Sequence, residues 1–136
     1  MIEKVSHIGI AVQSLTESLK VFEQALGLPL QSIEVVEDQG VRVAMLPVGE
    51  TRLELIEPMN ETGPIASFLR RKGEGIHHLC LEVDDLPAAL EALKQRGVRL
   101  VDEQPRIGAG GAKVAFLHPS STHGVLLELH EEAECS

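Results

Sequence analysis

The sequence contains an internal repeat, and this repeat constrains the fold more than any other feature. Residues 78–83 repeat the pattern of residues 7–12 at an offset of 71 positions. Each segment begins with a histidine, alternates small or apolar residues and ends in a valine. Further matches pair 43–46 with 114–117 at the same offset and 52–55 with 126–129 at an offset of 74. Two copies of one structural unit are therefore the predicted organisation.

The first copy predicts the order strand, helix, strand, strand, strand. Residues 5–12 are rich in Val and Ile and predict a strand. Helical spacing then joins Leu15, Leu19, Phe22 and Leu26, and Gly27 follows at the helix end. Short apolar runs bounded by turn residues predict three more strands, over 30–36, 41–48 and 51–56.

The second copy predicts the same order of elements. A connecting helix begins near Pro64 and ends in the basic residues 70–72. Residues 76–83 predict a strand, and a helix follows from Leu86 until Gly97 closes it. Three strands complete the copy, over 98–102, 113–117 and 124–130.

Such a unit has one apolar sheet face, which it cannot bury alone, so the two copies are expected to share a core or enclose a cleft. The predicted class is α+β, with two paired βαβββ modules forming a curved mixed sheet around a cleft. We expect one domain over 1–136, with modules 1–60 and 75–136 joined by a connecting helix in 61–74. A chain of 136 residues suits one domain of this size.

Charge and composition exclude several classes of function. The formal net charge is −9 and the isoelectric point is near 5.1, which argues against a surface for nucleic acid or anionic membranes. No apolar run approaches the length of a membrane span, and no secretory signal is visible. Cys80 and Cys135 do not form a disulfide framework, so a reducing cytoplasm is the expected location.

Two polar residues recur in each copy, and all four stand in predicted strands among apolar neighbours. They are His7 and Glu54 in the first copy, and His78 and Glu128 in the second. Because side chains alternate along a strand, both glutamates point away from their flanking leucines. A single strand glutamate is ordinarily exposed on a wet face, but four matched residues favour a metal site. Two imidazoles and two carboxylates suit one divalent cation such as cobalt, manganese, nickel or zinc.

The neighbouring histidines 77 and 78 must point to opposite sides of their strand, so only one of them can enter a given site. The match to His7 selects His78, and leaves His77 as a structural residue. His118, His123 and His130 have no counterpart in the other copy, and we expect them on the surface or in loops near a substrate.

The sequence resembles the vicinal-oxygen-chelate (glyoxalase-like) superfamily, and within it the methylmalonyl-CoA epimerases. The paired His and Glu mark the superfamily, whereas the strings Pro-Ile-Ala, Ile-Gly-Ala-Gly-Gly and Leu-His-Pro are more specific to the epimerases. The resemblance covers essentially the whole chain. The residues that carry it are 7–12, 38–41, 64–69, 75–80, 107–111, 116–119 and 124–129.

The resemblance implies an isomerase that interconverts (R)- and (S)-methylmalonyl-CoA. In that reading His7, Glu54, His78 and Glu128 hold one divalent cation, with cobalt as the first candidate. The cation stabilises the enolate formed when the proton between the two carbonyls is removed. Glu128 is the candidate base as well as a ligand. The family also implies a homodimer.

The sequence departs from some epimerases at Val43, where those proteins carry a second carboxylate. A valine cannot carry a proton, so Glu37, Asp38 or a water is left as the source of the second proton. Coenzyme A brings phosphates, and phosphates favour cationic partners. The available donors are Arg70, Arg71, Lys72, Arg106 and Lys113.

Three alternative functions belong to the same superfamily. A glyoxalase I-type lactoylglutathione lyase uses a similar set of ligands on a glutathione hemithioacetal. An extradiol dioxygenase needs only two histidines and one carboxylate. A metal-free binding module, as in antibiotic resistance, has no use for four ligands, so metal analysis of the purified protein separates it from the enzymes.

Overall fold

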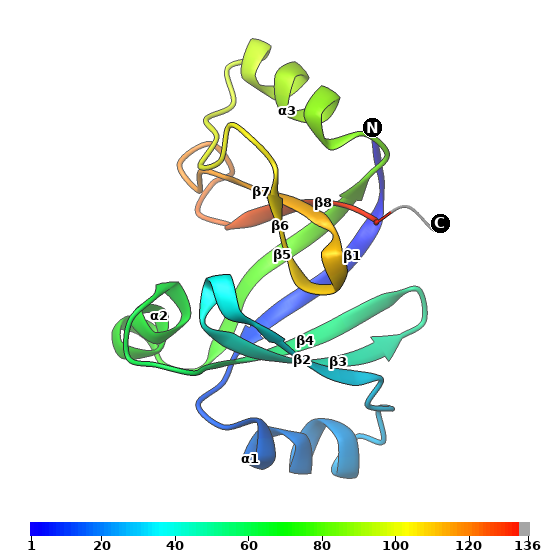
Figure 1. The fold of residues 1–136 in the computed structure, drawn as a ribbon, viewed down its shortest axis with the longest axis vertical. Coiled ribbons are helices and arrows are strands. Elements are labelled where there is room, and N and C mark those ends of the chain that lie inside the picture. Colours follow the sequence, from blue (N-terminus) through cyan, green and yellow to red (C-terminus); the bar gives the residue numbers. More distant parts are fainter. Residues whose placement is uncertain (134–136) are drawn as a thin grey trace. The chain divides into compact units, whose positions relative to one another are not determined.

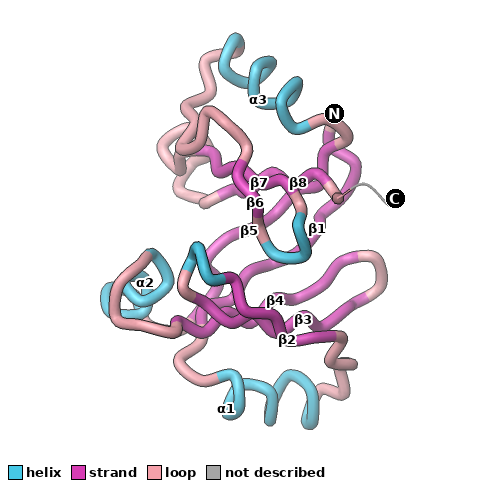
Figure 2. Tube along the Cα trace, viewed as in Figure 1, coloured by secondary structure: helices cyan, strands magenta, loops and turns pink. Residues whose placement is uncertain are grey.

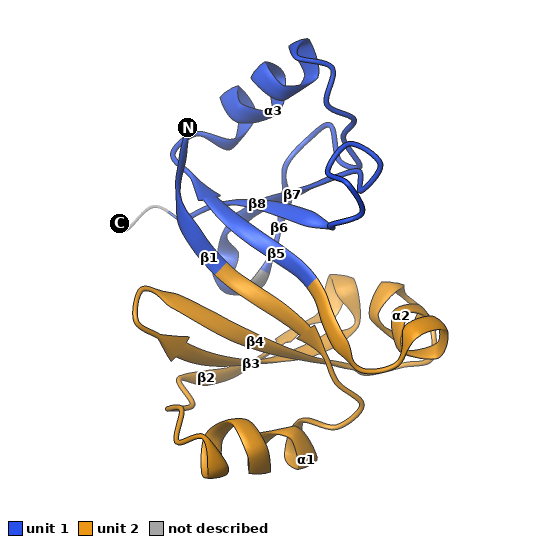
Figure 3. Ribbon diagram, turned by 180° about the vertical axis from the view of Figure 1, so that it is seen from behind, with its two compact units in different colours: residues 1–6, 78–136 blue, residues 7–77 orange. Residues whose placement is uncertain are grey.

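The structure is a computed structural model, and it describes residues 1–133. Contacts within the chain group residues 7–77 into one compact unit, and residues 1–6 with the chain from His78 onward into another (Figure 3). That these units form a single domain remains a prediction. Cys135 lies outside the described residues.

The unit of residues 7–77 contains sheet strands in the order β2-β3-β4-β1. Strands β1 and β4 run parallel, whereas β2, β3 and β4 pair antiparallel. Figure 1 shows helix α1 lying along one face of these strands. The elements are β1 (Ile2–Ala11), α1 (Leu15–Leu19), β2 (Ser32–Val36), β3 (Val41–Val48), β4 (Thr51–Pro58) and α2 (Pro64–Lys72).

The helix predicted from Leu15 to Leu26 is present but changes its period partway. Ser14 caps it by accepting a hydrogen bond from the backbone N–H of Glu17 at 3.1 Å. After α1 the chain continues as a π-helix over Lys20–Ala25, in which the N–H of Leu26 bonds the carbonyl of Val21 at 2.8 Å. Among the described residues, no helix combines the length and the apolar character needed to cross a membrane.

The other unit contains the strands in the order β5-β8-β7-β6, with β5 and β8 parallel and the remaining pairs antiparallel. Asp85 caps the start of helix α3, because its carboxylate accepts a hydrogen bond from the backbone N–H of Ala88 at 3.0 Å. Figure 2 distinguishes the helices from the strands. The elements are β5 (Gly75–Val83), α3 (Leu86–Gln95), β6 (Arg106–Ile107), β7 (Lys113–Leu117) and β8 (Leu127–Glu131).

The hydrophobic core of each unit is built from residues that the repeat matches. One cluster of five buried core residues in the first unit has its counterparts, at an offset of 71 or 74, in a core cluster of the second. The matched pairs are Val12 and Val83, Leu15 and Leu86, Ala44 and Ala115, Leu46 and Leu117, and Leu55 and Leu129. The two predicted βαβββ copies and the α+β class are therefore confirmed.

The strand predicted over 98–102 is wrong. This segment forms one isolated bridge, between Leu100 and Leu117, and no ladder. Around the bridge, the carbonyl of Arg99 accepts the N–H of His118 at 2.8 Å, and the N–H of Val101 bonds the carbonyl of Phe116 at 2.9 Å. On either side of these bonds, polar side chains take the place of backbone partners: Ser121 accepts the N–H of Arg99 at 2.9 Å, and Asp102 accepts that of Phe116 at 2.9 Å. The second strand of this copy is instead the two-residue β6, further along the chain.

The last strand begins three residues later than the predicted start at Gly124. The N–H of Gly124 bonds the carbonyl of Pro119 at 2.8 Å, and that of Val125 bonds Thr122 at 3.2 Å. Gly124 also has a φ of +90°, in the left-handed region that glycine tolerates best. These turn hydrogen bonds take up the backbone groups that would otherwise join the ladder.

Candidate metal centre

His7 and Glu54 form a buried pair within the unit of residues 7–77. His7 lies on β1 and Glu54 on β4, and their Nδ1 and Oε2 atoms are 3.3 Å apart. They are only 5% and 4% exposed. Parallel pairing of β1 with β4 places the two strands next to each other in register. The wet outer face considered for Glu54 is therefore excluded.

Arg52 supports this pair and was missed in the sequence. Its Nε donates a hydrogen bond to Oε2 of Glu54 at 2.8 Å. The signal was available, because residues two apart on a strand share a face. A guanidinium that holds one oxygen of a carboxylate fixes the direction of that carboxylate, as outer partners of metal ligands do.

His78 and Glu128 form the matching pair in the other unit. His78 lies on β5 and Glu128 on β8, and their Nε2 and Oε1 atoms are 3.2 Å apart. Both are buried, at 6% and 7% exposed. The ring of Phe116 meets the His78 ring edge to face, with centroids 5.6 Å apart. Both copies thus place a histidine beside a glutamate, through Nδ1 of His7 in the first and through Nε2 of His78 in the second.

His77 has different surroundings from His78. Its ring packs edge to face against Phe68 of α2, with centroids 5.0 Å apart and the planes at 88°. His78 instead faces the carboxylate of Glu128. This agrees with the alternation of side chains along β5, and it leaves His77 as a packing residue.

A second repeated glutamate, also missed in the sequence, fixes the helices to the strands that carry the site. Glu57 accepts the backbone N–H of Leu15 at 2.8 Å, and Glu131 accepts that of Leu86 at 2.7 Å. Both carboxylates therefore satisfy a donor in the first turn of a helix. Each lies three residues after the glutamate of its site, so the offset of 74 would have revealed the match.

The same repeat places one basic residue beside each of these carboxylates. Arg42 lies 3.6 Å from Glu57, and Lys113 lies 3.6 Å from Glu131, each opposite its partner in the strand register. Each copy thus ties a helix start, a strand carboxylate and a neighbouring strand together. This arrangement holds β4 and β8, and with them Glu54 and Glu128, at fixed positions in their own units.

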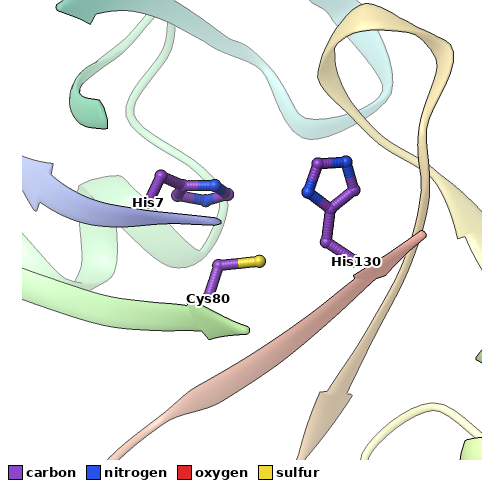
Figure 4. Close-up of side chains that lie close together, drawn as sticks. All are labelled: His7, Cys80 and His130. Atoms are coloured by element: carbon purple, nitrogen blue, oxygen red, sulfur yellow. The ribbon is translucent and has the colours of Figure 1, made fainter. Parts of the chain in front are cut away.

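The expectation that His130 lies on the surface is wrong. It is 3% exposed on β8, and its Nδ1 lies 2.8 Å from the hydroxyl of Ser6. Cys80 on β5 is fully buried, and its sulfur lies within 4.8 Å of a ring nitrogen of His130. Figure 4 shows both side chains, and it also labels His7 on β1.

The residues considered for the second proton differ in burial. Val43 is 4% exposed on β3, so this position is apolar and shielded. Glu37 and Asp38 stand in a short 3-10 turn and are exposed. None of these three residues is a member of either His–Glu pair.

The cationic residues considered for phosphate contacts fall into two groups. Arg106 and Lys113 are engaged with carboxylates, at 3.2 Å from Asp102 and 3.6 Å from Glu131. Arg70, Arg71 and Lys72 are the exposed or partly exposed last turn of α2, where positive charge also complements the helix dipole.

The donor set fits a divalent cation. Each pair offers one imidazole nitrogen and one carboxylate oxygen at just over 3 Å, which is close to the spacing of neighbouring ligands around an ion with bonds of about 2.1 Å. Burial of Glu128 also favours a charge-compensating partner, because a buried carboxylate is costly unless it is paired, whereas Glu54 already has such a partner in Arg52.

Residues 6–116 match the sequence profile of the Glyoxalase/Bleomycin resistance protein/Dioxygenase superfamily. The protein YqjC of Bacillus subtilis, described as uncharacterized, is 44% identical over 94% of this chain and 91% of its own length. The ethylmalonyl-CoA/methylmalonyl-CoA epimerase of Cereibacter sphaeroides is 38% identical over 96% of this chain and 99% of its own length.

A solved structure shows the same fold. It is a methylmalonyl-CoA epimerase in complex with methylmalonyl-CoA and NH4+, and it superposes with a TM-score of 0.93. The two sequences are 35% identical, and the match covers 98% of this chain and 96% of that one.

Proposed function

The chain belongs to the Glyoxalase/Bleomycin resistance protein/Dioxygenase superfamily, and on that premise we propose that it is an epimerase that interconverts (R)- and (S)-methylmalonyl-CoA. The observation that carries the proposal is the buried His–Glu pair in each of two repeated copies. The likeness to named epimerases over nearly the whole chain supports it.

We propose that His7, Glu54, His78 and Glu128 together bind one divalent cation. Two imidazoles and two carboxylates suit an ion of intermediate hardness, with cobalt first and manganese, nickel or zinc as the other candidates. When bound, such an ion supplies Lewis-acid stabilisation of the negative charge that develops on the thioester oxygen. Arg52 orients Glu54 within this set through its hydrogen bond of 2.8 Å.

Glu128 is proposed to move the proton at carbon 2 of the substrate. Its carboxylate takes that proton, the electron pair passes into the carbonyl system as an enolate, and a proton returned to the opposite face inverts the centre. The buried position of Glu128 excludes water from the carboxylate, and contact with His78 at 3.2 Å fixes its orientation. The second proton comes from a group other than Val43.

For the coenzyme A portion, we propose phosphate contacts from the last turn of α2. Arg70, Arg71 and Lys72 place three positive charges in one turn. Arg106 and Lys113 are less suited, because each already lies beside a carboxylate. Cationic side chains bind phosphate oxygens through charge-assisted hydrogen bonds.

The test follows proton exchange directly. The metal-loaded protein is incubated with methylmalonyl-CoA in deuterated water, and the proton at carbon 2 is followed by NMR against a sample without protein. Loss of that signal at a rate well above the control, with appearance of the opposite epimer from a single starting epimer, is the expected result. Exchange no faster than the control would overturn the proposal.

The two neighbouring histidines provide a matched test of the ligand set. His78→Ala is expected to lower the affinity for cobalt at least about tenfold, because it removes a donor from the proposed site. His77→Ala is expected to leave cobalt affinity unchanged, since His77 packs on Phe68. Isothermal titration of the two variants measures this, and the opposite ranking would show that the wrong histidine was selected.

Assembly and location stay predictions. We propose a homodimer, which light scattering coupled to size-exclusion chromatography measures as twice the mass of the chain. We propose the cytoplasm as the location, and fractionation of expressing cells tests it.

A further inference from the structure

A second group of metal-ligating side chains lies in the unit that contains β5 and β8. Glu82 on β5 and His130 on β8 are direct partners in the parallel strand register. Glu132 follows His130 by two residues and lies one position past the end of β8. One donor atom from each of the three lies within 4.8 Å of the other two.

We propose that Glu82, His130 and Glu132 form a binding site for a divalent transition-metal ion. None of the three residues is among the four proposed ligands of the epimerase, although the two groups share β5 and β8. One imidazole and two carboxylates suit zinc, nickel, cobalt or manganese. Donors around a tetrahedral zinc ion stand about 3.4 Å apart, so side chains within 4.8 Å need only small movements to reach one ion.

The imidazole is already oriented for such a role. Nδ1 of His130 lies 2.8 Å from the hydroxyl of Ser6, and Nε2 is directed toward Oε1 of Glu132 at 3.8 Å. A metal-binding histidine characteristically has its second ring nitrogen held by a hydrogen bond, which fixes the ring. Burial of His130 at 3% exposure makes this orientation rigid.

The carboxylates need a positive partner. Oε1 of Glu82 is shielded from solvent and has no hydrogen-bond partner among the described residues. Burial, above all, raises the pKa of Glu82; the charge of Glu132 and a hydrogen bond to its carboxyl add to the rise, whereas Lys4 opposes it. A cation held between the two carboxylates and the imidazole would relieve this demand in place of a proton.

The donors of this site differ in their exposure to solvent. The side chain of Glu132 is 61% exposed, whereas that of His130 is 4% exposed. An ion can therefore approach through Glu132 and meet the buried imidazole without unfolding of the strand. Replacement of Glu132 should also leave the fold intact, since the residue is on the surface.

Zinc titration of the chelator-treated full chain tests the proposal. In a His78→Ala background, which disables the proposed epimerase site, zinc is still expected to bind and to shift the ring nitrogen signals of His130 in an NMR spectrum. Adding Glu132→Gln is expected to weaken that binding at least about tenfold. Adding Glu3→Gln instead should leave it unchanged, because Glu3 is an exposed charge near Glu82 that is not one of the three donors.

Two results would overturn the site. The first is that zinc leaves the His130 ring signals unmoved in the His78→Ala background. The second is that Glu132→Gln and Glu3→Gln weaken zinc binding equally. The loss would then come from removing a negative charge anywhere nearby, and not from removing a zinc ligand. Neither result bears on proton exchange at methylmalonyl-CoA, so failure here is distinct from failure of the epimerase.

Discussion

Replacing Glu128 by glutamine is expected to slow deuterium exchange at carbon 2 of methylmalonyl-CoA by about 100-fold or more. The amide cannot accept the proton, although its carbonyl oxygen can still bind a cation. The residue is 7% exposed and lies 3.2 Å from His78, so the shape-conserving substitution should preserve the surrounding packing. Exchange is measured by NMR at several cobalt concentrations, so that loss of metal and loss of the base are separated.

The repeat supplies the matched control, Glu54→Gln. This variant makes the same carboxylate-to-amide change at the equivalent strand position. The native Glu54 carboxylate is held by Arg52 at 2.8 Å, and we propose it as a metal ligand and not as the base. Its exchange rate should recover at high cobalt concentration, whereas that of Glu128→Gln should not. If both variants stay equally slow with cobalt in excess, Glu128 is not the base. A larger loss in Glu54→Gln would place the base in the first copy.

The order of helices and strands could be predicted because the spacing of apolar residues is regular and occurs in both copies of the repeat. Leu15, Leu19 and Phe22 pack on the core as their helical spacing indicates. The matched core of the second copy repeats the pattern residue by residue. An apolar pattern that occurs twice at a fixed offset indicates which side chains are packed in the core, because a chance alternation would not recur at the same positions.

The segment 98–102 shows where the pattern misleads. Val98 and Leu100 are apolar because they pack against the core of their unit, and not because they sit in a ladder. Periodicity records which side chains are buried, whereas a strand also requires backbone partners along its length. Here the backbone pairing is limited to a few bonds around Leu100, and Ser121 and Asp102 bond backbone groups at its ends. The alternation of apolar residues does not reveal this.

For the candidate site, the repeat identified residue types but not their supporting contacts. The four candidate ligands are all buried in strands, as their matched positions suggested. The match between Glu57 and Glu131 has the same offset of 74, so it could have been found in the sequence. Their hydrogen bonds to the first residues of the helices could not, because a glutamate in a strand does not indicate which helix it contacts. His130 has no counterpart at all, so its burial beside Ser6 follows only from the fold.

Leu55→Ala is expected to lower the free energy of unfolding by about 2–5 kcal/mol, because it leaves a cavity that its neighbours fill only in part. Leu55 is 0% exposed and packs in the core of the unit of residues 7–77. Urea unfolding followed by circular dichroism measures the loss. Leu26→Ala is the control, since Leu26 is 61% exposed and its truncation should cost no more than about 0.5 kcal/mol. Equal losses in both variants would mean that Leu55 is not part of a packed core.

The repeat makes this substitution a test of the predicted single domain as well. Leu129 is the counterpart of Leu55 in the other unit, and it is 1% exposed. If the units unfold as one domain, Leu55→Ala and Leu129→Ala should each shift a single cooperative transition, with the same slope against urea. Separate domains would instead give two transitions, with each variant moving only the one that belongs to its own unit. A four-ligand site drawn from both copies needs the first outcome, because ligands on independently folding units would not stay positioned around one ion.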